Sequence, residues 1–378
     1  MRIASIVVTH HRLPIDPPFH ATWDSRPRTS FDIAVVRVTT DEGLTGVAAG
    51  DDMPGFEGHE DLFLGHHPLA LERHRRVLEN LNFLYGRCWS LDLALWDLAG
   101  KIAGQPVWRL LGGLDRTVAV YASSGARREP AETATFAEHA MARGFRALKL
   151  RFWRADWHDD LAVVEAVRAR MGERLVIMVD CNQGWRMPWD TAAPWTFKDA
   201  LEVARALEGL GVYWMEEPLH RADHEGLAAL RQSSAIRIAG GEGDRERHEL
   251  RDLIDRRCLD IVQPDVAWSG GISGVRRIAV MAAEHGIAFS PHTWGTGVGL
   301  LANAHLAAGL GGCPYLEYPY DPPDWTSERR DFMLRKPIDI TSDGTLLLDE
   351  TPGLGFMLDE ERLAATRLQV GGDRPTGT

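Results

Sequence analysis

Short apolar runs alternate with longer stretches of helical periodicity from residue 116 onward. In the stretch 271–286, for example, Ile278, Met281 and Ala282 share one face of a predicted helix. Runs that are apolar almost throughout are typical of strands covered on both faces, as in parallel sheets. Eight such strand–helix units favour a closed barrel over an open, doubly wound sheet. The eight runs are residues 117–124, 145–152, 174–182, 212–218, 236–242, 259–265, 286–292 and 314–319.

The N-terminal part of the chain has a different pattern. Residues 90–104 have the apolar spacing of a helix, with Ser90 as its N-cap and Gly104 as its C-terminal stop. Three earlier apolar runs predict strands, and a turn joins the last two. These runs are residues 2–15, 32–43 and 44–51.

We therefore predict two domains, an α+β domain over residues 1–115 and a barrel over residues 116–329. The tail, residues 330–378, has strand and hairpin signals and is expected to return to the first domain. Two long loops of the first domain, residues 16–30 and 51–67, are rich in Pro, Gly and His. Loops of this kind often form lids or binding sites.

Composition narrows the class of protein. The formal net charge of -12 argues against a nucleic-acid partner, because phosphate binding needs a basic surface. No apolar run approaches the ~20 residues of a membrane span, and the N-terminus lacks the pattern of a signal peptide. The four cysteines form no CxxC pair and are expected to be free thiols of a reducing cytoplasm. No glycine-rich nucleotide-binding motif follows a strand, which weakens the nucleotide-fold alternatives.

Polar or ionisable residues end every predicted strand from the second to the eighth. The active sites of parallel barrels lie at this end of the strands. One such residue would be unremarkable as a helix cap or loop residue, but seven consecutive strand ends indicate a site. The residues are Lys149, Arg151, Asp180, Asn182, Glu216, Glu217, Glu242, Asp265, His292 and Glu317.

Three of these acids predict a metal site. Asp180, Glu216 and Glu242 end successive strands, and three carboxylates converging in a low-dielectric mouth would repel one another. A hard divalent cation removes this repulsion, and Mg²⁺ prefers carboxylates together with water and substrate oxygens. Glu217 should face away from the metal by strand alternation unless the strand bends there, and we expect it to pair with a cation or an amide that supports the site.

Two further pairs predict catalytic groups. Asp265 and His292 end neighbouring strands, and an Asp beside a His fixes the tautomer of the imidazole and raises its basicity, as in a general base.

Lys149 and Arg151 are two residues apart on one strand, so both should face the barrel interior. A substrate carboxylate would supply the anion that two buried cations need.

Several short motifs occur along the chain in a characteristic combination. They are LKLRF, VDCNQGW, WMEEPL, AGGE, VQPDVAWSGGIS, SPHTWGTGVG and YLEYP, together with residues 94–113. In combination they resemble the mandelate racemase subgroup of the enolase superfamily. The resemblance implies a capping domain, built from both termini, over a (β/α)₇β barrel. It also implies Mg²⁺ on Asp180, Glu216 and Glu242, a His292–Asp265 dyad, Glu317 hydrogen-bonded to an enolate oxygen, and an even-numbered homo-oligomer.

Two features depart from the family pattern. The second strand commonly carries Lys-x-Lys, with the second lysine as a base, whereas this chain has Arg151 there. Residues 185–197 look like an insertion that contains three tryptophans. We expect this insertion to shape the pocket or an oligomer interface, unless it is only a surface loop.

The shared chemistry of the family is removal of a proton α to a carboxylate, which gives an enediolate that Mg²⁺ and a cation such as Lys149 stabilise. We predict dehydration of an acid sugar to a 2-keto-3-deoxy acid, with Asn182, Trp294 and His20 as substrate-binding residues. Racemisation or epimerisation, or cycloisomerisation of a sugar lactone, is the alternative. A sugar-acid or metal-binding protein without catalysis is disfavoured, because the base and the metal ligands are all present.

Overall fold

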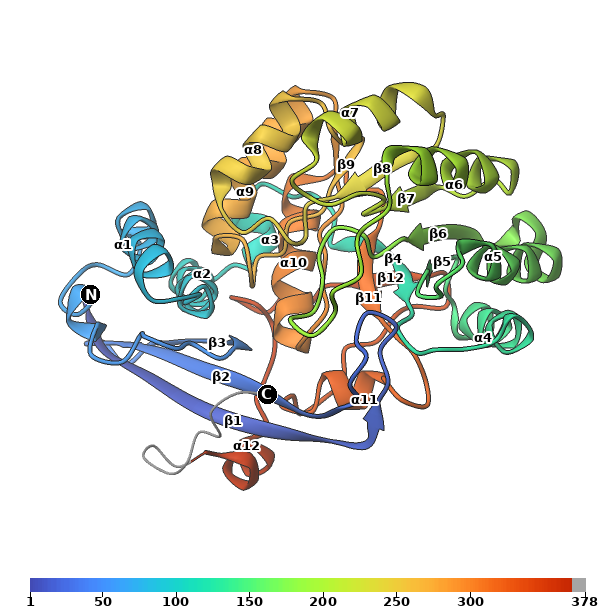
Figure 1. Ribbon diagram of the computed structural model, residues 1–378. Coiled ribbons are helices and arrows are strands. Elements are labelled where there is room, and N and C mark those ends of the chain that lie inside the picture. Colours follow the sequence, from blue (N-terminus) through green and yellow to red (C-terminus); the bar gives the residue numbers. More distant parts are fainter. Residues whose placement is uncertain (369–378) are drawn as a thin grey trace.

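An antiparallel sheet and three helices form the N-terminal part of the computed structural model, which describes residues 1–368. The strands pair in the order β1–β2–β3, and β3 lies against α2 (Figure 1). Gly46 of β3 approaches the backbone of α2 so closely that a Cβ atom would meet the Ala94 carbonyl oxygen. The elements are β1 (Ile3–Phe19), β2 (Arg28–Thr40), β3 (Thr45–Asp51), η1 (Glu60–Leu62), α1 (Leu71–Leu84), α2 (Ser90–Ala103) and α3 (Val107–Leu110).

Two details of this region differ from the sequence-based expectation. Helix α2 has Trp89 as its N-cap, and no side chain caps it, so the prediction of Ser90 as N-cap is wrong. Ser90 is the first helical residue and packs against Gly50 of β3, because tertiary packing outweighs its capping preference. Gly104 does end the helix, with a left-handed φ of 63°. Strands β1 and β2 also extend into the predicted loop 16–30 and leave a shorter connection.

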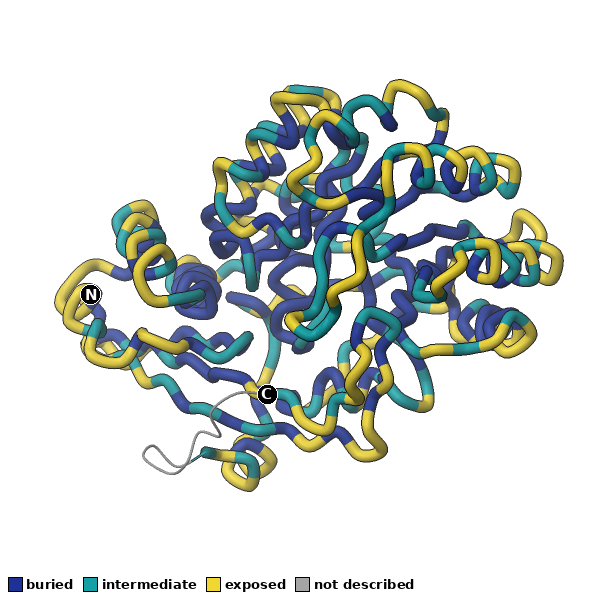
Figure 2. The backbone as a smooth tube through the Cα atoms, viewed as in Figure 1, coloured by how far each residue is buried: buried dark blue, intermediate teal, exposed yellow. Residues whose placement is uncertain are grey.

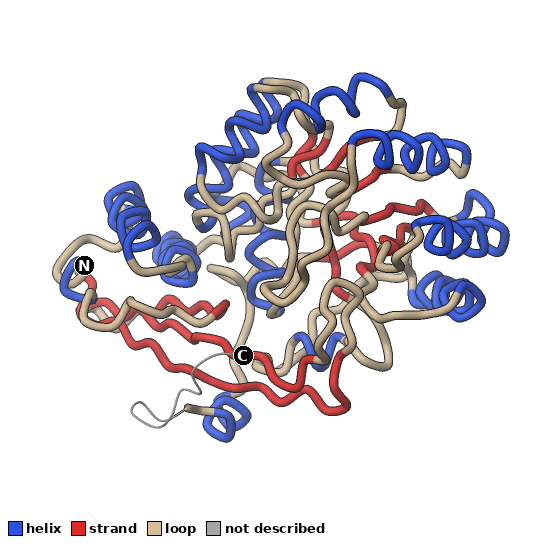
Figure 3. The backbone as a smooth tube through the Cα atoms, in the orientation of Figure 1, coloured by secondary structure: helices blue, strands red, loops and turns tan. Residues whose placement is uncertain are grey.

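Eight parallel strands form the barrel, one within each predicted run, in the order β10–β9–β8–β7–β6–β5–β4–β11. Helices lie on the outside of this curled sheet (Figure 3). The strands are β4 (Thr117–Ser123), β5 (Ala147–Arg151), β6 (Val176–Asp180), β7 (Trp214–Glu216), β8 (Arg237–Gly240), β9 (Ile261–Val262), β10 (Ala288–Phe289) and β11 (Leu316–Pro319). The helices between them are α4 (Pro130–Arg143), α5 (Trp157–Met171), η2 (Gly172–Arg174), α6 (Phe197–Gly209), α7 (His224–Ser233), α8 (Arg247–Asp255), α9 (Gly271–Glu284) and α10 (Gly297–Leu310).

Side-chain hydrogen bonds, rather than backbone pairing between strands, join β10 to β11. The Ser290 hydroxyl donates to the Tyr315 carbonyl oxygen, and the Thr293 hydroxyl donates to the Glu317 carbonyl oxygen at 3.1 Å. These bonds hold the two strands together where the backbone pairing ends. The predicted architecture, a barrel of the (β/α)₇β type with a capping domain, is confirmed.

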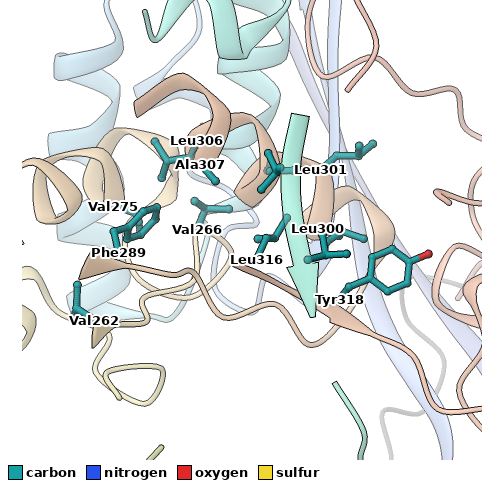
Figure 4. Packing of buried hydrophobic residues seen from close by; sticks show 14 of the residues in the cluster. Val262, Val266, Val275, Phe289, Leu300, Leu301, Leu306, Ala307, Leu316 and Tyr318 are labelled. Atoms are coloured by element: carbon teal, nitrogen blue, oxygen red, sulfur yellow. The ribbon is translucent and has the colours of Figure 1, made fainter. Parts of the chain in front are cut away.

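Buried residues line both faces of the barrel strands, whereas exposed residues concentrate on the outer helices (Figure 2). Inside the barrel, Tyr121, Met178 and Trp214 belong to one apolar cluster. Between the sheet and the helices, side chains such as Val275, Phe289 and Leu300 form the larger core (Figure 4). Burying each such side chain stabilises the fold by ~1.5–3 kcal/mol. This core fixes the strand ends on which the site is built.

The tail contacts the barrel before it reaches the cap. Strand β12 (Thr345–Leu347) pairs with β4, and α12 (Glu360–Thr366) lies against β1, where the Leu368 amide donates to the His10 carbonyl oxygen. The short helix α11 (Ser327–Arg330) precedes both. Residues 369–378 of the predicted returning tail lie outside the described part. Within the described residues, no helix is long and apolar enough to cross a membrane.

Candidate active site

Three buried carboxylates meet at the C-terminal end of the barrel strands. Asp180 ends β6, Glu216 ends β7, and Glu242 follows β8 by two residues. One ligand oxygen from each residue lies within 4.8 Å of the other two. Burial raises the pKa of Asp180 and of Glu216, although the neighbouring Lys149 and Arg151 oppose the shift. The structure thus brings together the three acids that the sequence predicted as metal ligands.

The donor set fits a hard divalent cation. The Oε2 atom of Glu242 is buried and has no hydrogen-bond partner among the described residues, while its Oε1 atom accepts a hydrogen bond from Trp185 Nε1 at 3.0 Å. A buried carboxylate oxygen without a partner is costly. A Mg²⁺ ion held by Asp180, Glu216 and Glu242 would remove that cost and supply the positive charge that three clustered carboxylates need.

Lys149 and Arg151 both face this cluster, as strand alternation predicted. The ammonium group of Lys149 lies 2.6 Å from Glu216 Oε1 and 2.9 Å from Glu317 Oε1. Burial lowers the pKa of Lys149, but the carboxylates of Glu216 and Glu317 outweigh burial and raise it. The two carboxylates therefore favour the charged form of Lys149 in this arrangement.

Arg151 connects the metal site to the cap. Its guanidinium pairs with Asp180 and lies 4.5 Å from the centre of the Trp23 ring, on the loop between β1 and β2. The same guanidinium also lies 5.4 Å from the centre of the Trp294 ring. Burial lowers the pKa of Arg151, but Asp180 and Glu317 outweigh burial, so the net shift is upward. No sequence pattern marks Trp23 as a site residue beyond its place in a predicted lid loop.

His292 and Asp265 form the expected dyad. The Nδ1 atom of His292 lies 3.0 Å from Asp265 Oδ2, and a carboxylate only accepts, so Nδ1 carries the proton. The opposite nitrogen, Nε2, lies 3.5 Å from Glu242 Oε2 and 3.7 Å from Glu317 Oε2. Burial lowers the pKa of His292, but Glu242, Glu317 and the hydrogen bond to Asp265 raise it to about 9 overall.

Glu317 is an acceptor in this structure. Burial raises its pKa, but Lys149 and His292 outweigh burial and lower the pKa to about 2. It accepts hydrogen bonds from the Ser123 hydroxyl at 2.6 Å and from the Thr293 amide at 2.8 Å. An ionised Glu317 cannot donate to an enolate oxygen, so the role implied by the family resemblance requires protonation when an anionic substrate binds beside it.

The remaining predicted residues differ in where they lie. Asn182 is beside the cluster, where its side chain accepts from Arg151 at 3.3 Å and donates to the Phe152 carbonyl oxygen at 2.9 Å. Trp294 stacks on Trp325, with ring centres 5.9 Å apart. His20 is exposed just after β1, and no hydrogen bond or ion pair joins it to the site among residues 1–368.

Glu217 lies where the chain bends at the end of β7. It is buried, with a left-handed φ of 46° that turns the chain at the end of β7. Its side chain forms no hydrogen bond or ion pair with the described residues, so the expected cation or amide partner is not found there. Burial, followed by the nearby Glu242 and Asp180 carboxylates, raises the pKa of Glu217 well above its usual value.

The tryptophan-rich insertion, residues 185–197, contacts the site and the cap. Trp185 donates to Glu242, as described above, and the Arg26 guanidinium of the cap loop lies 4.4 Å from the centre of the Trp189 ring. Trp195 packs edge-on against Phe152, which follows β5. The insertion is therefore more than a surface loop, because it joins a candidate metal ligand to the cap.

A second contact from the cap reaches the dyad. The Trp268 ring lies 4.7 Å from the His292 ring, and the Arg87 guanidinium lies 5.6 Å from the centre of the Trp268 ring. Arg87 in turn pairs with Asp51 of β3 at 3.0 Å. Sequence reasoning missed Trp268 and Arg87, because nothing local marks a residue that covers the face of a distant histidine.

Known proteins share this arrangement. Residues 132–362 match the family described as "Enolase C-terminal domain-like", and residues 3–112 match the N-terminal domain of the mandelate racemase / muconate lactonizing enzyme family. Arabinonate dehydratase of Saccharolobus solfataricus is 34% identical over 273 residues, which cover 71% of this chain and 69% of that protein. D-galactarolactone cycloisomerase of Agrobacterium fabrum is 29% identical over 379 residues, 95% of this chain and 96% of the relative.

A solved structure agrees with these relatives. The L-talarate dehydratase of Polaromonas sp. JS666, crystallised with Mg and L-glucarate, superimposes with a TM-score of 0.82 at 27% identity and covers 97% of this chain and 98% of its own. The matches extend over both domains, and the relatives are enzymes of related chemistry. This chain is an enzyme of the enolase superfamily and belongs to its mandelate racemase / muconate lactonizing enzyme family.

Proposed function

We propose that this enzyme dehydrates an acid sugar to a 2-keto-3-deoxy acid, with Mg²⁺ held by Asp180, Glu216 and Glu242. The proposal rests on an asymmetry at the C-terminal end of the barrel, where the groups on the two sides of the site differ in their ability to move a proton. The His292–Asp265 dyad supplies one group that can move a proton, while Arg151, where relatives commonly place a second basic lysine, is pinned by Asp180. A guanidinium does not deprotonate near neutral pH, so it is a poor second base.

Binding of the substrate carboxylate is the first requirement. A Mg²⁺ ion held by Asp180, Glu216 and Glu242 would supply positive charge that stabilises the negative charge developing on the substrate. Lys149, fixed by Glu216 and Glu317, offers a buried ammonium for the same oxygens. Such a preorganised charge stabilises the enediolate more than the substrate, because the enediolate carries more negative charge.

Proton transfer then falls to His292. The neutral imidazole takes the proton from the α-carbon at Nε2, and the C–H electron pair becomes part of the enediolate. Asp265 accepts the Nδ1 proton in a hydrogen bond and stabilises the imidazolium that forms. Burial lowers the pKa of His292, but the carboxylates of Glu242 and Glu317 raise it to about 9 and so favour its protonated form, and a Mg²⁺ ion held by Glu242 would oppose that rise and favour the neutral imidazole that this step needs.

Elimination completes the reaction. The enediolate electrons expel the β-hydroxyl group, which leaves as water after His292 returns a proton to it on the same face. The resulting enol takes up a proton at C3 and becomes the 2-keto-3-deoxy acid. A lid residue could supply the acid instead. In a further alternative Lys149 is the base and His292 is the acid, and the close ion pairs of Lys149 with Glu216 and Glu317 disfavour the neutral amine that this needs.

Cycloisomerisation of a sugar lactone is the second candidate. The match to D-galactarolactone cycloisomerase covers 95% of this chain, more than the 71% covered by the match to arabinonate dehydratase. One base is enough for that reaction as well. The two candidates differ in substrate and leaving group, because the lactone reaction expels the ring oxygen of a lactone, whereas dehydration expels a free hydroxyl group as water.

A screen distinguishes the candidates. The enzyme is incubated with Mg²⁺ and a panel of aldonates, aldarates and their lactones in deuterated water, and NMR follows α-deuteration, stereochemistry and keto acid. We expect a 2-keto-3-deoxy acid from at least one open-chain acid. Epimer without keto acid for every substrate turned over, or turnover of lactones with no keto acid from any open-chain acid, would refute the dehydratase.

The role of His292 has its own test. His292→Asn is expected to lower the rate by roughly 10²–10⁴-fold, as loss of a general base does, and Asp265→Asn to lower it less. His285→Asn is the matched control, because His285 follows α9 and contacts the Met281 carbonyl oxygen, remote from the site. A larger loss for Asp265→Asn would identify Asp265 as the base.

The predicted homo-oligomer also stays a proposal. Several apolar side chains at the end of α1 are exposed, among them Phe83 at 83% and Leu84 at 63%, which supports burial of this surface between copies of the chain. Light scattering of the wild type and of Phe83→Ser would test it. A monomeric wild type at micromolar concentration would contradict the prediction.

A further inference from the structure

Two polar side chains, Asn303 and His305, lie in an otherwise apolar, buried helix. Helix α10 is buried over nearly its whole length, and Asn303 lies at its centre with no exposed surface. Asparagine is a weak helix former, and a buried amide is costly unless its donors and acceptor are satisfied. A residue with both costs at this position requires a compensating interaction.

The amide of Asn303 is satisfied by groups of the dyad and the loop that carries it. Its Nδ2 donates to Asp265 Oδ1 at 2.9 Å and to the His292 carbonyl oxygen at 3.2 Å. Its Oδ1 accepts from the Val266 amide at 3.2 Å. One side chain therefore ties the residue after Asp265, the Asp265 carboxylate and the backbone of His292 to the same point on α10.

The consequence for Asp265 is geometric. Its Oδ1 atom accepts from Asn303 and from the Ala267 amide at 2.9 Å, which leaves Oδ2 for His292. Without the Asn303 donor, the carboxylate could rotate and the His292 backbone would lose its anchor. The ring would then sample orientations in which Nε2 no longer points at the α-carbon, and misplacement of a catalytic group by 1 Å can cost ~100-fold in rate.

We propose that Asn303 is a positioning residue, which acts on the reaction through Asp265 and His292. The inference rests on the proposed role of His292 as the base. The competing explanation is purely structural, in which Asn303 only anchors α10 to the loop after β9 through Val266. The two explanations differ in whether the effect of Asn303 depends on the Asp265 carboxylate.

A double-mutant cycle separates them. Asn303→Leu is expected to lower kcat about 10–100-fold with KM nearly unchanged, as outer partners of a site do. In an Asp265→Asn background the same change should lower kcat less than about twofold, because coupled residues are not additive. Multiplied losses in the double variant, or an unaltered kcat in Asn303→Leu, would overturn the proposal.

His305→Gln provides the control on the same helix. His305 is equally buried, but it accepts from the Trp108 amide and contacts the Leu354 carbonyl oxygen, away from the dyad. Its change should leave kcat unaltered in both backgrounds. If Asn303→Leu does not fold, as judged by circular dichroism, Asn303→Ser replaces it in the cycle with the same expectations.

A second readout needs no substrate. A His Nδ1 proton hydrogen-bonded to a buried carboxylate gives a low-field proton NMR resonance, which His292→Asn would assign by its loss. We expect this resonance in the wild type and in His305→Gln, and broadening or loss in Asn303→Leu. An unaltered resonance in Asn303→Leu would contradict the proposal even if no substrate had been found, whereas absence of turnover in the wild type would count only against the proposed function.

Discussion

Acid should destabilise this protein through His305, and His305→Gln should remove that part of the acid sensitivity. His305 lies on α10, is 1% exposed, and links the barrel to the segment that leads from the cap and to the tail. Its Nδ1 accepts the Trp108 amide proton at 3.0 Å, so Nε2 carries the proton toward the Leu354 carbonyl oxygen at 3.2 Å. A second proton would have to displace the Trp108 hydrogen bond.

The magnitude follows from the pKa. Burial, only partly offset by the Leu354 carbonyl oxygen and Asp349, lowers the pKa of His305 from 6.5 to about 4. The unfolded chain therefore binds the proton first as the pH falls, so stability is lost between pH 6.5 and pH 4 and no further below that. At ~1.36 kcal/mol per pKa unit the full loss is about 3.4 kcal/mol, of which about 2 kcal/mol has occurred at pH 5.

Glutamine is the informative replacement because it cannot titrate, while its amide can accept from Trp108 and donate to Leu354. Urea unfolding of the wild type and of His305→Gln is measured at pH 7.5 and pH 5 by circular dichroism and tryptophan fluorescence. The stability difference between the two proteins should shift by ~2 kcal/mol in favour of the variant at pH 5. Other buried histidines, such as His11 and His74, are common to both proteins and cancel.

Equal losses of stability in the two proteins between pH 7.5 and pH 5 would refute the reasoning. That result would mean that His305 keeps its ordinary pKa in the folded protein, or that α10 opens to water without global unfolding. Hydrogen exchange of the Trp108 amide would distinguish these causes, because the amide is protected only while the imidazole accepts its proton.

Three further predictions concern the metal site and the direction of the reaction. Glu242→Gln should weaken Mg²⁺ binding at least about tenfold in calorimetry while the fold survives, and wild-type affinity would contradict the ligand assignment. Trp185→Phe removes the 3.0 Å hydrogen bond to Glu242 Oε1 and should weaken Mg²⁺ by ~10–100-fold, whereas Trp195→Phe should leave affinity within about twofold. Arg151→Lys introduces an amine that can act as a base, so NMR should detect epimer beside keto acid; complete absence of epimer would show that Arg151 does not decide the outcome.

The sequence alone shows which polar groups end the predicted strands and which of them share a face. Apolar runs such as 212–218 end in acids, and strand alternation fixes that Lys149 and Arg151 face the same side. These properties are local: a period of two along a strand decides which face a side chain occupies, whatever the rest of the fold does. The helical periodicity and the number of strand–helix units likewise sufficed for the barrel and its cap.

Contacts between distant segments had no such local signal. Asn303 follows Asp265 by 38 residues, and the cap residue Trp23 lies against Arg151 although 128 residues separate them. Composition and spacing do not reveal that the amide of Asn303 will hydrogen-bond the Asp265 carboxylate, or that an indole in a loop will lie against a guanidinium.

Tertiary structure decided these pairings because they depend on how helices and loops dock, which is set by the packing of whole surfaces rather than by neighbouring residues. Ser90 shows the same limit in reverse, since its local preference for an N-cap yielded to packing against Gly50. The sequence by itself therefore determined which groups stand at the mouth of the barrel. Closure of the sheet and docking of the cap decided which of them touch, because only those steps bring the separate strand ends and the loop between β1 and β2 within hydrogen-bonding distance.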